Sequence, residues 1–148
     1  HKLMELILIS GLVSLLGGIA VGLQGPLSSI IGQNIGILES VFIVHLGGAV
    51  LAGFLLLFSG GGNLSAWRSV PWYALMAGFL GLLVISSVNF SIPRIGVSAT
   101  IAFMVTAQLL VSMALDHYGL LEVASKAVTP TRFLGAAALI FGTWLITR

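Results

Sequence analysis

The sequence predicts an all-α integral membrane protein with five transmembrane helices. Of its 148 residues, 58% are hydrophobic and only 7% are charged, and the mean hydropathy is +1.16. A membrane span needs roughly 20 apolar residues, because a helix rises about 1.5 Å per residue through about 30 Å of hydrocarbon. Five apolar stretches near this length leave too few residues for a soluble domain in which they could be core helices.

We expect these stretches to form a single membrane domain, residues 1–148. The first is too long for a signal-peptide core and no small-residue cleavage site follows it, so we expect a retained helix. Residues 1–3, His-Lys-Leu, are what a tag and a cloning scar would leave, which makes Met4 the expected initiator. The expected spans are Leu3–Leu23, Ile37–Ser59, Pro71–Phe90, Ile95–Leu115 and Phe133–Thr147.

Composition also argues against several classes of protein. The chain has no cysteine, so it can form neither a disulfide nor a thiolate metal site. Its few histidines and acids show no ligand spacing, so we expect no metal and no cofactor. A net charge of +2 is too small for a nucleic-acid footprint. No catalytic triad or nucleotide-binding motif is present, so we do not expect an enzyme or an ATP-driven pump.

Four connectors separate the predicted spans. Residues 24–36 are uncharged but rich in amides, hydroxyls and glycine, and we expect Pro26 to end or kink the first helix there. Such a segment suits a cavity wall or a partly embedded loop, or it is a short amphipathic surface loop. We expect a flexible loop over residues 60–70, a tight turn over 91–94, and a long charged loop over 116–132.

The cationic residues of these connectors are nearly balanced across the membrane. Five spans place Arg68, Lys126 and Arg132 on one side and Arg94 and Arg148 on the other. The positive-inside rule needs an excess on one side to fix orientation. We therefore expect weakly specified topology and an antiparallel homodimer. The alternatives are that the three-charge side is cytoplasmic, or that a paired homologous subunit sets the orientation.

Glycines recur within the predicted spans. Lipid gives no hydrophobic drive between helices, so small residues permit the close backbone approach that holds helices together. We expect packing to explain most of them, with bending an added role in the segment from Gly78 to Gly81. The packing and hinge candidates are Gly18, Gly22, Gly47, Gly78 and Gly81.

Two titratable residues stand out because ionisable groups are costly inside a membrane. Glu39 lies at the start of the second span, where a carboxylate in a partly dry cavity could exchange a proton for a cationic substrate. The alternative is an acid that only stabilises the helix N-terminus. His45 lies six residues further along and could titrate near neutral pH, although a hydrogen bond to a neighbouring helix is the commoner role.

Other polar residues are candidates for lining a transport path. Gln24 and Asn34 bound the first connector, and Gln108 lies deep in the fourth span, where it either joins helices or contacts substrate. Asp116 closes that span and could pair with Arg132 or Lys126. Asn89 and Thr106 are further polar groups of the spans, and Trp72 and Tyr73 are expected interfacial anchors or a gate.

These residues occur in short motifs that resemble the small five-helix YdcZ-like family of the drug/metabolite transporter superfamily. The order and spacing hold over essentially the whole chain, with Ala107 standing where the family would show glycine. The motifs are Gly22-Leu23-Gln24 followed by Asn34, Val44-His45-Leu46-Gly47, Pro71-Trp72-Tyr73, Gly78-Phe79-Leu80-Gly81, Pro93-Arg94-Ile95-Gly96, Ala107-Gln108-Leu109-Leu110, Asp116-His117-Tyr118-Gly119 and Arg132-Phe133-Leu134-Gly135.

The resemblance implies ATP-independent transport of a small molecule by a multi-pass protein of the bacterial inner membrane. It also implies assembly in pairs around one midplane site, with the lipid bilayer and a second copy as partners. We therefore expect a secondary transporter of a small polar or cationic metabolite or drug, working by alternating access and coupled to protons through Glu39. The alternatives are a passive channel formed by a dual-topology dimer, and a non-transporting assembly subunit.

Overall fold

The computed structural model describes residues 1–148, and every regular element in it is helical. Four helical segments are long and apolar enough to cross a membrane, and a fifth apolar helix is shorter, at 17 residues. The predicted all-α membrane fold is therefore confirmed, with the fifth span remaining a prediction. The elements are α1 (Lys2–Ile35), α2 (Ile37–Phe58), the 3-10 helix η1 (Leu64–Ser69), α3 (Trp72–Leu75), α4 (Ala77–Ile95), α5 (Val97–Tyr118) and α6 (Pro130–Ile146).

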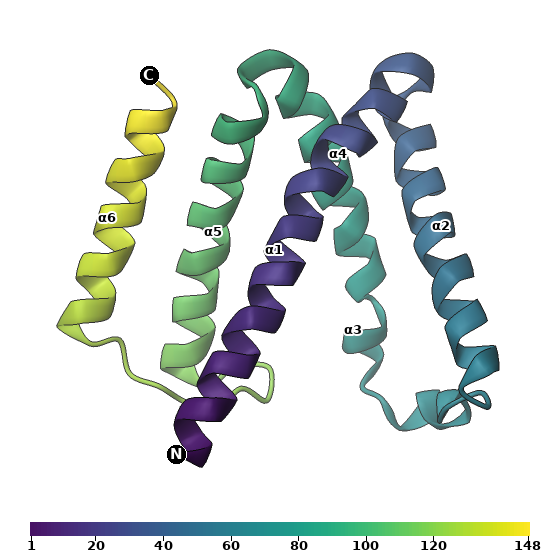
Figure 1. The fold of residues 1–148 in the computed structure, drawn as a ribbon, viewed down its shortest axis with the longest axis horizontal. Coiled ribbons are helices and arrows are strands. Elements are labelled where there is room, and N and C mark those ends of the chain that lie inside the picture. Colours follow the sequence, from purple (N-terminus) through teal and green to yellow (C-terminus); the bar gives the residue numbers. More distant parts are fainter. The chain divides into compact units, whose positions relative to one another are not determined.

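The helices form two compact units, which are described separately. The first comprises His1–Pro93 and the second Arg94–Arg148. In the first unit α1 packs against α2, and in the second α5 packs against α6. Figure 1 shows α1 and α2 joined by a sharp reversal of the chain.

The expected connector at residues 24–36 is wrong, because α1 continues through it to Ile35. Pro26 lies inside the helix and does not end it. Proline is tolerated within transmembrane helices because neighbouring groups satisfy the freed backbone. With 34 residues, α1 is about 51 Å long, which exceeds the thickness of the hydrocarbon core.

The expected turn at residues 91–94 is wrong for the same reason. α4 runs through Pro93 to Ile95, and the helix is interrupted only at Gly96. The helical break in this span falls at Met76, between α3 and α4, and not within the segment from Gly78 to Gly81. In this chain the helices therefore continue through Pro26 and Pro93. They are interrupted instead at glycines with positive φ, Gly36 and Gly96.

At two points of the chain a single glycine separates consecutive helices. Gly36 separates α1 from α2 at φ 122°, ψ 154°, and Gly96 separates α4 from α5 at φ 83°, ψ 169°. This backbone region is essentially restricted to glycine. Each glycine is the N-cap of the following helix, and its carbonyl accepts the first helical bond there, from Ser40 N to Gly36 O and from Thr100 N to Gly96 O.

The remaining connectors are loops with local order. Residues 60–62 are three glycines with positive φ, and η1 follows them. α5 ends at Gly119 in the left-handed conformation. α6 begins with Thr129, whose hydroxyl accepts a hydrogen bond from Arg132 N, and with Pro130 in its first turn. Both are standard N-terminal signals.

The interior of the protein is small and mainly polar. The buried apolar residues are few and mostly small or β-branched, whereas Leu and Phe side chains along every long helix are exposed. That arrangement suits a hydrocarbon solvent, in which apolar surfaces need no burial and polar groups do. The buried residues are Gly25, Val41, Ile85, Val88, Ala99 and Ala136, and the polar Ser28, Ser29, Ser40, Asn89, Thr100 and Thr143.

Replacing Gly96 by alanine tests whether the junction between α4 and α5 requires glycine. We expect Gly96→Ala to lower the free energy of unfolding by about 1–3 kcal/mol, because alanine is strained at this φ and ψ. No atom lies near the added methyl group, so the loss reports backbone strain alone. Unfolding in mixed micelles measures it. Gly135→Ala in α6, where the methyl group also meets open space, is the control and should cause no loss.

Candidate functional site

A buried polar cluster ties three helices of the first unit together. Ser28 of α1 and Ser40 of α2 place their hydroxyl oxygens 2.9 Å apart, and Ser40 Oγ lies 2.8 Å from Ser28 O. Asn89 of α4 donates from Nδ2 to Ser28 Oγ at 2.7 Å and to Ile85 O at 2.8 Å. One consistent chain of donors results, in which the amide donates to Ser28, Ser28 to Ser40, and Ser40 to a backbone carbonyl.

The cluster requires glycine on the facing side of α1. Asn89 Oδ1 is buried without a hydrogen-bond partner and occupies the space that a Gly32 side chain would fill. About two turns earlier on the same face of α1, Gly25 lies against Val88 and Ile92 of α4. Gly25 and Gly32 therefore permit the close approach of α1 and α4, a role that we had expected of Gly18 and Gly22. The sequence signal for this contact is the pair Ser28 and Ser29 followed by Gly32, about one helical turn later.

Two predicted site residues, Gln24 and His45, line one groove of the first unit. The groove has a volume of about 360 Å³ and its other walls are small or apolar: Val44, Gly48, Ala49, Gly81, Val84 and Ile85. Its walls come from α1, α2 and α4. The groove is open, and its polar groups are few.

The hydrogen bonding of His45 defines its tautomer. Nδ1 lies 2.7 Å from Val41 O, one turn earlier in α2. A carbonyl oxygen only accepts, so Nδ1 carries the proton and the neutral ring has its lone pair on Nε2. Nε2 faces the backbone of Gly81 in α4, in the space that a side chain there would occupy. The groove thus contains one acceptor nitrogen and one amide, and no charged group.

Glu39 does not line this groove. It occupies the third helical position of α2, and its carboxylate folds back over Gly36 at the hairpin turn. It belongs to a separate, open surface with Ile35, Leu38, Phe42 and Ile43. An acid in the first turn of a helix interacts favourably with the helix dipole. Asn34 is also near the turn, and its amide donates to Ile30 O within α1 at 2.8 Å.

The second unit holds Gln108 and Asp116 at different places on α5. The Gln108 side chain is exposed and makes no hydrogen bond within the protomer. Near the middle of α5, Thr106 contacts Thr143 of α6, and their hydroxyl oxygens lie 2.6 Å apart. Thr143 also lies 3.3 Å from Ala102 O. We named Thr106 among the polar groups of the spans but not Thr143, and the pair joins the two helices.

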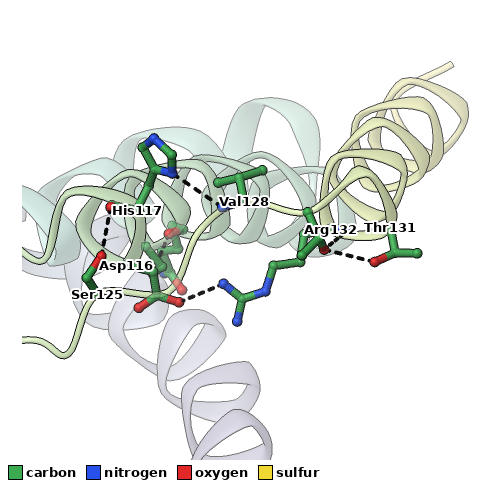
Figure 2. Close-up of polar contacts among 9 residues, drawn as sticks. Asp116, His117, Ser125, Val128, Thr131 and Arg132 are labelled. Atoms are coloured by element: carbon green, nitrogen blue, oxygen red, sulfur yellow. Dashed lines mark hydrogen bonds and ion pairs between the residues drawn. The ribbon is translucent and has the colours of Figure 1, made fainter.

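An ion pair links the ends of α5 and α6, as we had expected for Asp116. Arg132 Nη1 lies 3.3 Å from Asp116 Oδ2, and both side chains are partly exposed, at 39% and 31%. Figure 2 shows the loop between these helices folding back onto His117. Val128 N donates to His117 Nδ1 at 3.3 Å, and Ser125 Oγ donates to His117 O at 3.1 Å.

The remaining candidates lie on exposed surfaces. Trp72 and Tyr73 form α3 and stack edge to face with ring centroids 6.1 Å apart. Among the five candidate glycines, only Gly81 meets a neighbouring side chain, that of His45. Methyl groups added to the others would meet open space within the protomer, so their packing role remains a prediction for a second copy. These open glycines are Gly18, Gly22, Gly47 and Gly78.

Comparison with known proteins agrees with the motifs. Residues 9–145 match the family described as "Putative inner membrane exporter, YdcZ". This chain belongs to the YdcZ-like family. A curated member, inner membrane protein YdcZ of Escherichia coli (strain K12), is 31% identical over 114 residues, which cover 76% of each chain. No solved structure matches.

Membership of the YdcZ-like family establishes the location of the protein. The protein is a multi-pass protein of the inner membrane, consistent with its apolar helices. The family description is that of an exporter and not of an enzyme. The predicted family and membrane location are therefore confirmed, whereas substrate, coupling and site residues need separate argument.

Replacing Gly32 by alanine tests the contact between α1 and α4. We expect Gly32→Ala to destabilise the fold, because the methyl group would overlap the side chain of Asn89. Adding Asn89→Ala should recover part of that loss, with a coupling of about 0.5–3 kcal/mol in a double-mutant cycle. Gly22→Ala, which meets nothing, is the control. Additive effects of the two substitutions would contradict the contact.

Neutralising Asp116 tests the ion pair with Arg132. Because both side chains are partly exposed, we expect Asp116→Asn to cost about 1 kcal/mol or less in unfolding free energy. The loss should shrink in high salt, which screens exposed pairs. The same unfolding measurement on Glu122→Gln, a loop acid without an ion-pair partner, provides the reference. A loss of several kcal/mol would show that the pair is far better shielded than its exposure indicates.

Proposed function

We propose that this protein is a secondary transporter that moves a small polar solute through alternating access to the groove lined by Gln24 and His45. The observation that carries the proposal is the groove itself: two polar side chains from different helices converge among small apolar residues. The family description, an inner membrane exporter, supports the direction from cytoplasm to outside. In this proposal α6 is the fifth membrane span.

A second copy, antiparallel in the proposal, would complete the site. The groove is open on one side, where an amide and an imidazole would otherwise face hydrocarbon, and uncompensated polar groups there are costly. Gln108 is likewise exposed and needs a partner. Open glycine surfaces on α1 and α2 suit close helix contact between protomers. A paired homologous subunit would meet the same requirement.

Coupling to protons would use one of two titratable groups on α2, Glu39 or His45. Glu39 lies at the hairpin turn and His45 in the groove. Trp72 and Tyr73 would anchor or gate the adjacent membrane interface, and Asp116 and Asn34 would contribute at the ends of the path. Site residues outside the groove therefore act at entry and exit in this proposal, and the groove residues contact the solute.

Reconstituted protein in liposomes tests transport directly. The liposomes contain a pH indicator and are exposed to gradients of four solutes: erythritol, urea, ethylammonium and tetramethylammonium. We expect proton movement that is slow, saturates with solute concentration and depends on the presence of at least one solute. A fast electrogenic leak that no solute affects would indicate a passive channel. Absence of any flux, with co-purification of a larger partner, would indicate a non-transporting subunit.

A further inference from the structure

We propose that Nε2 of His45 is the atom at which proton and solute compete, and that the solute is an uncharged hydrogen-bond donor. This inference rests on the proposed transport function and deepens it. The fixed tautomer of His45 leaves one acceptor lone pair within the groove. A proton and an O–H or N–H donor both need that lone pair, so their binding is mutually exclusive.

The groove contains no charge that would favour an ionic solute. The walls contribute Gln24 from α1, Val44, Gly48 and Ala49 from α2, and Gly81, Val84 and Ile85 from α4, none of which titrates. The nearest acid along α2, Glu39, folds over Gly36 and belongs to another surface. A permanently charged solute would lack a counterion in this apolar surrounding. An uncharged donor matches the neutral imidazole and the Gln24 amide.

Gly81 is the residue that makes room for the imidazole ring of His45 beside α4. Its missing side chain leaves the space that His45 Nε2 occupies against the backbone of α4. Any larger residue would displace the ring from its present position. The glycine in the motif that we had assigned to bending thus has a specific local role, which is to accommodate the acceptor nitrogen.

Because the proton and the solute cannot bind Nε2 at the same time, the groove exchanges one for the other. When the proton binds, an N–H bond forms at Nε2, the imidazole becomes a cation and the solute loses its acceptor. When the proton leaves to water, the lone pair is restored and the solute can bind again. Entry of a proton from outside therefore favours release of the solute, which agrees with the direction expected of an exporter. The affinity for solute should therefore be lower in acid than in base, because the proton and the solute need the same lone pair.

The liposome assay separates this inference from the proposed function. We expect erythritol or urea to drive proton movement, and the two ammonium ions to drive none. His45→Gln and Gly81→Ala should abolish it, whereas Gly78→Ala, three residues away in open space, should retain it. No solute-driven flux in the wild-type protein overturns the proposed function. Flux that survives His45→Gln, or that only Glu39→Gln abolishes, overturns the inference while leaving transport intact.

A spectroscopic measurement guards against misfolding of the variants. The wild-type protein, with ¹⁵N-labelled histidine in lipid nanodiscs, should show an unprotonated Nε2 and a protonated Nδ1 at His45 at high pH. Erythritol or urea should shift the Nε2 resonance, and acid should abolish the shift. The spectrum of His45→Gln assigns the signal among the chain's three histidines. A protonated Nε2 at high pH, or a shift caused only by the ammonium ions, overturns the proposal.

Discussion

Hydrocarbon supplies no hydrogen-bond partners, so the backbone must satisfy its own N–H and C=O groups wherever it lies in the membrane. This constraint accounts for the length of the helices and the brevity of their turns. α1 and α4 remain helical up to Ile35 and Ile95, and a single glycine with positive φ follows each of them. A loop of several residues would leave more backbone groups to be satisfied by other means.

The same constraint makes the interior of this protein differ from that of a soluble domain. A soluble domain buries leucine and phenylalanine, whereas this chain exposes them and buries serine, threonine and asparagine. The hydrogen bonds among Ser28, Ser40 and Asn89, and between Thr106 and Thr143, thus join helices from the inside. Such bonds are worth only about 0.6 kcal/mol on average in membrane proteins. Close glycine contacts such as that of Gly32 must add to them.

The class of fold and the family could be read from hydropathy and short motifs, because both are written in consecutive residues. The helix ends at Gly36 and Gly96 could not, because Pro26 and Pro93 carry the stronger local signal and the membrane overrides it. It also could not be predicted that Gln24 and His45 line one groove, although each was a candidate. It depends on how three helices pack, and no spacing along one helix reports that.

The two prolines within helices have a mechanical consequence. Each lacks an N–H, so the carbonyl four residues earlier, that of Gly22 in α1 or Asn89 in α4, loses its regular helical bond. α1 and α4 both contribute walls to the groove, and each is missing one backbone bond along its length. Bending stiffness is lowest where a bond is missing. The walls of the groove are therefore compliant at defined points, and they can flex there without unfolding a turn.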